Sequence, residues 1–193
     1  MALYTSSYLK GLLKTKTLNE STRMFSSEMK TRTTFDIFLS HSFLDKEEVE
    51  GLYIELTRLG YSVYVDWIID PELDRNNVTK KSAAIIRNRL KSSKSLLLAV
   101  SVNAAISKWM PWELGYVDGN TSKCAIIPVS KSDYAPNSYE GVEYLSLYPF
   151  IKKLPTTQGN EILWVIEGAN KYVNFPDWLR RGIQPKMQAR NIF

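Results

Sequence analysis

The chain has 193 residues, of which 44% are hydrophobic and 23% are charged, and this balance excludes a largely disordered chain. The length suits one globular domain with a full hydrophobic core. The formal net charge is +5, and the positive surplus lies in residues 1–34 and 177–193. Because the middle of the chain carries no such surplus, we interpret the charge as favouring solubility and expect no nucleic-acid partner.

Cys124 is the single cysteine, and it stands in an apolar run. One cysteine excludes a disulfide within the chain and argues against a metal site, so we expect a buried thiol in a reducing, cytoplasmic compartment. The longest apolar stretch, residues 96–106, is interrupted by polar side chains. It is far shorter than the roughly 20 residues of a membrane-spanning helix, so no membrane contact is expected.

Residues 1–33 form a basic N-terminal extension. Their Ser, Thr and Lys content loosely resembles a transit peptide. Leu9, Leu12 and Leu13 instead fall on one side of a helix over residues 4–13. We favour the helix and treat the extension as helical.

From Thr34 onward, strand patterns alternate with helix patterns. The predicted strands are 35–40, 61–70, 95–102, 124–129 and 144–151. The predicted helices are 45–60, 79–92, 109–118 and 157–172.

Two helices carry specific signals. Asp45 is a good N-cap residue, and Glu48 three positions later completes a capping-box pattern. Gly60 supplies the C-terminal stop of the same helix. Apolar side chains from Ile162 to Val173 keep helical spacing, which favours a last helix there.

This alternation predicts an α/β, flavodoxin-like three-layer fold with a parallel five-stranded sheet flanked by helices. The expected domain spans residues 34–173, and residues 174–193 form a basic C-terminal extension. Ligands of such sheets bind beyond the carboxyl ends of the strands. The loops of interest are therefore 40–45, 66–78 and 101–113.

The usual cofactor signatures are absent from the sequence, including a glycine-rich dinucleotide turn and a phosphate loop. His41 is the only histidine, and Ser40 and Ser42 flank it. Neighbours on a strand point to opposite faces, so they form no Ser–His pair. We expect His41 to line a pocket rather than to act as a base.

The densest candidate site is the segment from Trp109 to Glu113, which places two tryptophans beside one carboxylate. If Trp109 is already helical, Glu113 lies one turn away on the same face. If Pro111 starts the helix, Glu113 lies in the first turn, near the positive end of the helix dipole. Either arrangement suits a positively charged, oxocarbenium-like transition state. The alternative is an ordinary helix glutamate between two core tryptophans.

Four motifs in this order resemble bacterial TIR (Toll/interleukin-1 receptor) domains. They are FDIFLSHS, VYVD, LLAVS and the WxxxE spacing from Trp109 to Glu113. The segments SKWMPWELGYVDG and YLSLYPFI are similar to the TIR-like proteins of the bacterial Thoeris antiphage system. The resemblance covers residues 34–172.

The resemblance implies an enzyme that cleaves the nicotinamide–ribose bond of NAD and cyclises ADP-ribose to a signalling nucleotide. Glu113 matches the catalytic glutamate of the family. The implied substrate-binding residues are Trp109, Asp66, Ser40, His41, Phe43 and Ser101. NAD is the substrate, and neither a metal nor a bound cofactor is implied. The implied partners are an antiphage effector protein, reached through the diffusible product, and other TIR domains through self-association.

Two alternatives stay open. One is a non-catalytic TIR adaptor that acts by protein–protein assembly, for which Glu113 beside Trp109 would serve no purpose. The other is an enzyme like nucleoside deoxyribosyltransferases, which share the general fold and the glutamate chemistry. Turnover of nucleosides without turnover of NAD would point to the second.

Overall fold

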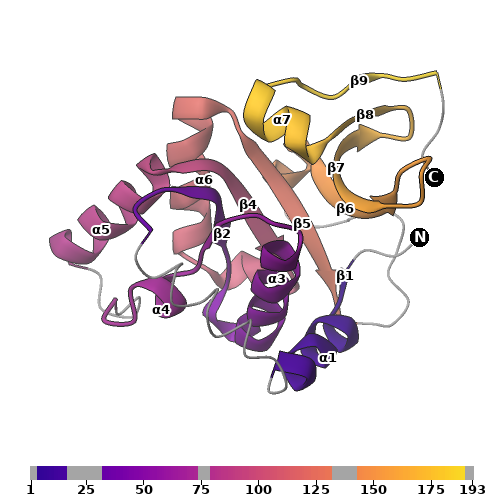
Figure 1. Cartoon of the computed structure of the whole chain (residues 1–193). Helices are drawn as coiled ribbons and strands as arrows, with labels where there is room; N and C mark the ends of the chain where they lie inside the picture. Colours follow the sequence, from indigo (N-terminus) through magenta and orange to yellow (C-terminus); the bar gives the residue numbers. More distant parts are fainter. Residues whose placement is uncertain (1–3, 17–31, 74–78, 132–142, 190–193) are drawn as a thin grey trace.

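The computed structural model describes residues 4–16, 32–73, 79–131 and 143–189 (Figure 1). Three apolar strands, β2 (Phe35–Ser40), β4 (Ser93–Val100) and β5 (Cys124–Ser130), run parallel to one another, with β4 between the other two. They match the predicted strands 35–40, 95–102 and 124–129 to within two residues at each end. Long apolar runs of this kind are typical of strands that are covered on both faces.

The side chains of β4 alternate between two cores. Leu97 and Ala99 belong to one buried cluster, and Leu96, Leu98 and Val100 belong to the other. This alternation follows from the period of two in a strand. Both faces of the sheet are therefore buried, as the apolar run predicts.

Helices cover both faces of the sheet. The first core is completed by α1 (Ser6–Lys16), α3 (Lys46–Arg58) and α7 (Phe175–Arg181). The second core is completed by α5 (Lys80–Lys91) and α6 (Trp109–Thr121). The α/β class and the three-layer arrangement are thus confirmed (Figure 1).

The parallel part of the sheet has two short additions. The strand β3 (Val63–Tyr64) pairs with β2 at one edge, and β1 (Tyr4–Thr5) pairs with β5. The predicted strand 61–70 is too long, because the chain turns into the short helix α4 (Asp66–Ile69) directly after Val65. The change of direction brings Asp66 to the carboxyl end of the sheet.

The second half of the sheet differs from the prediction. The strands β6 (Phe150–Pro155), β7 (Glu161–Gly168), β8 (Lys171–Asn174) and β9 (Lys186–Met187) follow one another in antiparallel pairs. Within the described ranges the sheet therefore has nine strands and is mixed. The expectation of five parallel strands is wrong in this half, although β6 itself runs parallel to β5.

The predicted helix 157–172 is wrong, because this segment forms β7 and the first half of β8. Gly159 takes a left-handed φ of +85° and closes a tight turn, in which the amide of Thr156 donates to the carbonyl of Asn160 at 2.8 Å. A hairpin turn of this kind needs a residue that tolerates positive φ, and glycine does so at little cost. The aliphatic side chains of β7 fit the period of two of a strand as well as the helical period, so their spacing alone did not distinguish a strand from a helix.

The segment 144–151 is also only partly a strand. It begins as the 3-10 helix η3 (Glu143–Leu147), and β6 starts at Phe150. Proline at position 149 separates the two elements, since its fixed φ and missing amide favour such a boundary.

Helix α3 begins and ends close to the predicted positions, but its start is built differently. Asp45 occupies the N-cap position without a side-chain capping bond, so the predicted capping box is absent. Glu48 instead accepts a hydrogen bond from the Ser6 hydroxyl at 2.6 Å and pairs with Lys10. Gly60 follows the helix with a φ of +88°, as predicted.

The N-terminal helix exists as α1, two or three residues later than predicted, and it packs on α3. Leu9 is fully buried in the contact. A Cβ atom at Gly51 would stand 2.4 Å from the carbonyl oxygen of Leu9, so only glycine permits this close approach. Residues 17–31 of the predicted extension lie outside the described residues, as do residues 74–78 of the predicted polar loop.

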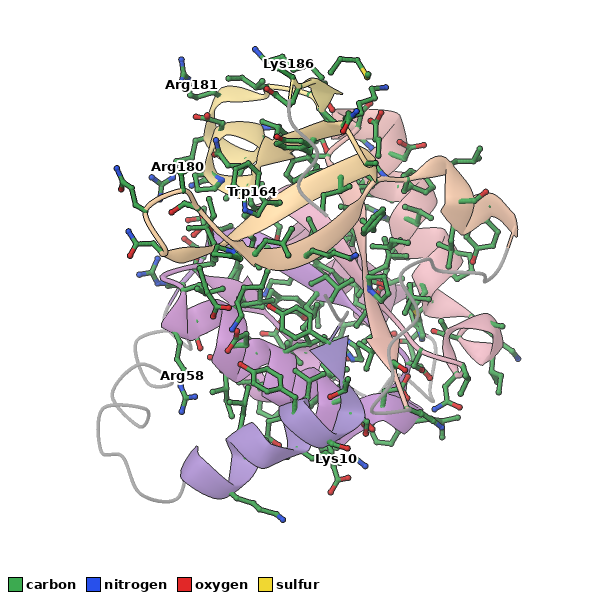
Figure 2. The ribbon with its side chains drawn as sticks, turned by 90° about the vertical axis from the view of Figure 1, so that its right-hand side faces the viewer. Lys10, Arg58, Trp164, Arg180, Arg181 and Lys186 are labelled. Atoms are coloured by element: carbon green, nitrogen blue, oxygen red, sulfur yellow. The ribbon has the colours of Figure 1, made fainter. Side chains whose placement is uncertain are left out.

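The basic side chains of the two chain ends are spread over the molecule. Figure 2 shows Lys10 on α1 at one end of the molecule and Arg181 and Lys186 at the other. In α7, Trp178 is 1% exposed, so this part of the predicted C-terminal extension packs on the sheet. No helix in the described ranges is long and apolar enough to cross a membrane.

Replacing Gly51 with alanine should lower the free energy of unfolding by about 1–3 kcal/mol, which is typical of overpacking, because the methyl group would push α1 off α3. Urea denaturation measures the change. Gly119→Ala in α6 is the matched control: its added Cβ would meet nothing within 4 Å. The control should be as stable as the wild type or about 0.5–1 kcal/mol more stable. Equal stability of Gly51→Ala and the wild type would contradict the packing of α1 on α3.

Candidate functional site

A cavity of about 770 Å³ lies beyond the carboxyl ends of β2 and β4. Its walls come from the loop after β2, the loop before α6, and the helices α5 and α6. The lining residues are His41, Ser42, Phe43, Leu44, Ala83, Arg87, Ile106, Ser107, Lys108, Trp109 and Trp112. The place is the one predicted for a ligand of a parallel α/β sheet, and the volume is typical of small-molecule sites.

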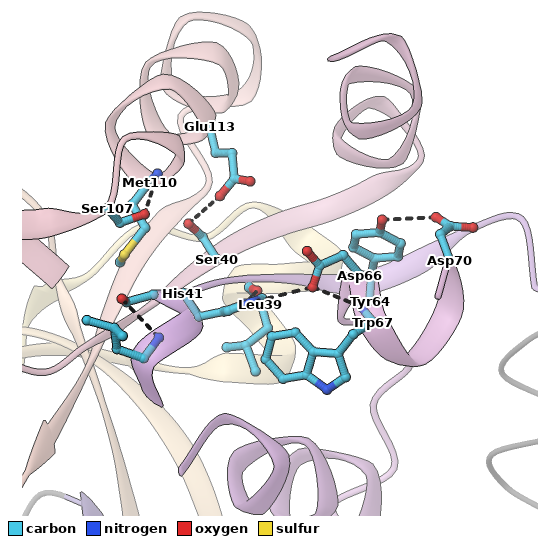
Figure 3. Close-up of polar contacts among 12 residues, drawn as sticks. Leu39, Ser40, His41, Tyr64, Asp66, Trp67, Asp70, Ser107, Met110 and Glu113 are labelled. Atoms are coloured by element: carbon cyan, nitrogen blue, oxygen red, sulfur yellow. Dashed lines mark hydrogen bonds and ion pairs between the residues drawn. The ribbon is translucent and has the colours of Figure 1, made fainter. Parts of the chain in front are cut away.

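The carboxylate of Glu113 is fully buried behind this cavity. The hydroxyl of Ser40, the last residue of β2, donates to Oε2 of Glu113 at 2.6 Å (Figure 3). A hydrogen bond from a neutral donor to a carboxylate is short and strong in a buried setting. The pair joins the end of strand β2 to helix α6, across 73 residues of sequence.

The start of α6 decides between the two arrangements that the sequence left open. The helix begins at Trp109, so Pro111 is its third residue and Glu113 lies beyond the first turn. Trp109 and Glu113 are therefore four residues apart on one helical face. The argument from the helix dipole does not apply, because that effect is confined to the first turn.

His41 has the partner that the sequence could not identify. Its Nδ1 lies 2.7 Å from the carbonyl oxygen of Leu39, which can only accept, so Nδ1 carries the proton (Figure 3). Its Nε2 lies 3.4 Å from Oδ1 of Asp66, and this pair attracts only when the imidazole carries a proton on both nitrogens. The ring of Trp67 contacts the imidazole edge-on, with 4.5 Å between the ring centroids. His41 and Asp66 are both almost fully buried, so these contacts hold the imidazole against the inner wall of the cavity.

Aromatic and aliphatic side chains form the outer part of the cavity. Phe43 is 57% exposed and meets Trp67 edge-on. Trp109 and Trp112 form a second edge-on pair, with 5.6 Å between the ring centroids. Flat aromatic surfaces of this kind can stack on a planar heterocycle.

Ser101, predicted to bind substrate, makes a different contact. Its hydroxyl donates to Oδ2 of Asp45 at 2.5 Å, and Nδ2 of Asn103 donates to Oδ1 of the same carboxylate at 2.6 Å. Ser101 is buried and is not among the residues that line the cavity.

Two cations face the cavity, Arg87 from α5 and Lys108 from the start of α6. Among the described residues that line the cavity, none is acidic. The sequence indicated only a basic helix over residues 79–92, and nothing in its local pattern singled out Arg87. In the part of the chain that the structure describes, no three His, Cys, Asp or Glu side chains are grouped so that they could hold a metal ion.

The predicted site residues thus fall into three positions. His41, Phe43 and Trp109 line the cavity. Three further residues are buried next to these lining residues. Ser40 directly precedes His41 and bonds to Glu113, and Asp66 contacts the ring of His41. Ser101 joins the loop after β4 to Asp45 and does not line the cavity.

The sequence matches the TIR domain family over residues 37–154. A relative from Bacillus cereus (strain MSX-D12), named as a probable 3′ cyclic ADP-D-ribose synthase ThsB′, is 51% identical over 150 residues, which are 76% of this chain and 76% of the relative. A relative from Cytobacillus dafuensis, TIR2, whose name designates a cyclic ADP-D-ribose synthase, is 27% identical over 95 residues. That match covers 49% of this chain and 25% of the relative.

Among solved structures, the chain is similar to the TIR domain of the Toll-related receptor TRR-2 from Hydra magnipapillata, with a TM-score of 0.42 and 21% identity. This match covers 58% of the chain and 78% of that domain. The family match spans more than half of the sequence, and one relative shares half of its residues over three quarters of its length. The resemblance noted in the sequence is confirmed, and the chain belongs to the TIR domain family.

Proposed function

We propose that the protein cleaves the nicotinamide–ribose bond of NAD and cyclises the remaining ADP-ribose to a signalling nucleotide. The observation that carries this proposal is a cavity with an aromatic lining, together with a buried carboxylate, Glu113, one helical turn after the lining residue Trp109. The names of the two relatives, both of cyclic ADP-D-ribose synthases, support the same reaction.

The chemistry requires little from the protein beyond position and charge. Nicotinamide already carries a positive charge in NAD, so it leaves with the electrons of the glycosidic bond and a cation develops on the ribose. A preorganised carboxylate stabilises such a cation where water is excluded. In the proposal, Glu113 holds the ribose and stabilises this charge, and Trp109 provides a flat surface for the substrate.

Glu113 reaches the substrate only if the wall of the cavity opens. It is fully buried, and its Oε2 accepts the hydrogen bond of Ser40. The barrier is short, because Trp109 lines the cavity one helical turn before Glu113 and His41 lines it next to Ser40. Substrate binding therefore has to part these side chains, while the carbonyl of Leu39 keeps His41 oriented.

Arg87 and Lys108 suit the pyrophosphate of NAD. Both line the cavity, and the described lining residues include no acid that would compete for them. Arginine and lysine bind phosphate oxygens through charge-assisted hydrogen bonds. In the proposal they anchor the centre of the dinucleotide, so that nicotinamide and adenine occupy opposite ends of the site.

The product acts away from the enzyme. A cyclic nucleotide diffuses, so we propose that it activates an antiphage effector protein, as the similarity to Thoeris proteins implies. The proposed compartment is the cytoplasm, where NAD is available. Self-association through the TIR domain is part of the same proposal.

A non-catalytic adaptor is the second candidate. The observation that favours it is the set of exposed apolar side chains at the cavity mouth, where Phe43, Leu44 and Ile106 are 57%, 64% and 68% exposed. Exposed apolar patches often mark protein contacts. The same side chains can also close over a bound dinucleotide, so they do not outweigh the carboxylate behind the cavity.

Glu113→Gln should lower the release of nicotinamide from NAD by roughly 100-fold or more, because the amide keeps the shape but cannot neutralise the cation. Nicotinamide and the second product are measured by chromatography with purified protein and in lysate of infected cells. Glu167→Gln in β7 is the control, and its activity should equal that of the wild type.

Equal release by Glu113→Gln and the wild type would remove Glu113 from the mechanism. No release by the wild type, even in infected lysate, would favour the adaptor. Release from nucleosides but not from NAD would favour the deoxyribosyltransferase-like alternative. Circular dichroism shows whether each variant is folded.

Arg87→Gln and Lys108→Gln should each raise KM for NAD by about 10-fold, because each loses one charge-assisted hydrogen bond worth about 1.5–3 kcal/mol. With nicotinamide riboside, which has no pyrophosphate, their KM values should match that of the wild type. Lys91→Gln on the same helix is the control, since Lys91 does not line the cavity. An unchanged KM for NAD in both variants would contradict the assigned pyrophosphate contact.

A further inference from the structure

Asp45 stands at a helix N-terminus without capping it. Aspartate is a preferred N-cap residue because its carboxylate accepts from the first free amides of the helix. In α3 this bond is not formed, although Asp45 occupies the position. A residue that departs from such a local rule is expected to serve another purpose.

The carboxylate of Asp45 joins two loops that are far apart in sequence. It accepts from the hydroxyl of Ser101 and from the side-chain amide of Asn103, at 2.5 and 2.6 Å. The backbone amide of Asn103 donates in turn to the Ser101 hydroxyl at 2.9 Å. Asp45 and Ser101 are 4% and 8% exposed, so these bonds are largely shielded from water. Both oxygens of the carboxylate are used on the loop that follows β4.

Each end of this connection supports one wall of the cavity. Phe43 and Leu44 directly precede Asp45 in the 3-10 helix η1 (Phe43–Asp45), and both line the cavity. Beyond Asn103, the 3-10 helix η2 (Ala104–Ile106) leads into a second part of the cavity wall, which begins at Ile106. These wall residues are themselves largely exposed. Little apolar packing fixes their separation, so the buried polar bonds of Asp45 are well placed to do so.

We propose that Asp45 is a positioning residue that holds the two cavity walls at a fixed separation and thereby directs the reaction toward cyclisation. This inference rests on the proposed function. Asp45 does not contact the substrate, and it acts through Phe43–Leu44 on one side and Ile106–Lys108 on the other.

The separation of the walls matters because the ribosyl cation has two fates. The bond from the ribose carbon to nicotinamide breaks, and nicotinamide leaves with the electron pair. The carbon then accepts an electron pair either from water, which gives linear ADP-ribose, or from a nucleophile within the same molecule, which gives the cyclic product. Water loses one proton when it attacks, and so does the internal nucleophile where it is a ribose hydroxyl group. A closed cavity holds the chain of the substrate folded and limits the access of water, so it favours the internal attack.

Asp45→Asn, Ser101→Ala and Asn103→Ala test the inference in the full-length protein. Each should raise the ratio of linear to cyclic product at least fivefold, and each should raise KM for NAD. The rate of nicotinamide release at saturating NAD should stay within about threefold of the wild-type rate. Glu47→Gln is the matched control: Glu47 lies in the same first turn of α3 but is exposed and pairs only with Lys10 among the described contacts. Its product ratio should equal that of the wild type. If Asp45→Asn does not fold, Asn103→Ala, which removes one bond from a half-buried residue, decides the question.

Amide hydrogen exchange provides a readout that needs no turnover. In Asp45→Asn, exchange in the segments 43–44 and 104–108 should both become at least fivefold faster, whereas in Glu47→Gln both should be unchanged. A folded Asp45 variant with unchanged exchange, or with an unchanged product ratio and KM, overturns the inference. Absence of NAD cleavage by the wild type overturns the proposed function instead, and the exchange result still shows whether Asp45 fixes the walls.

Discussion

The hydrogen bond from Ser40 to Glu113 is the contact on which the geometry of the site depends. It lies at the carboxyl end of strand β2 and reaches helix α6 on the second face of the sheet. A buried carboxylate is tolerated only where donors replace the water it has lost. Because Glu113 is fully buried, the bond from Ser40 orients its side chain and links α6 to β2, and the apolar side chains of α6 pack the helix on the sheet. The same contact sets where Trp109, one turn earlier on α6, meets the cavity.

The parallel strands β2 and β4 bring the remaining parts of the site together. Parallel strands end at the same edge, so the loops that follow them meet although they are about 60 residues apart in sequence. Polar contacts then determine how these loops lie: His41 bonds to the carbonyl of Leu39, and Asp45 bonds to Ser101. The apolar cores hold the sheet, and these few buried polar bonds hold the loops.

The sequence predicted what depends on local periodicity and missed what depends on distant partners. The apolar runs of β4 and β5 have one reasonable interpretation, and both strands form where expected. The aliphatic side chains of β7 fit two periods, and the turn at Gly159 decides for the hairpin. His41 and Asp45 were singled out by type, but the contact of His41 with Asp66 and that of Asp45 with Ser101 join separate segments and leave no local pattern. Arg87 was missed for the same reason.

Cationic and anionic side chains occupy different parts of the site. Arg87 and Lys108 are on the surface of the cavity, whereas the carboxylates of Glu113 and Asp66 are buried behind it. A dinucleotide with an anionic pyrophosphate and a cationic nicotinamide has the complementary arrangement. Its pyrophosphate would be held on the cavity surface, and the positive charge that develops on the ribose would be drawn toward Glu113. In the proposed reaction the cations therefore act on the pyrophosphate and the carboxylate acts on the ribose, so that the two kinds of charge serve different parts of the substrate.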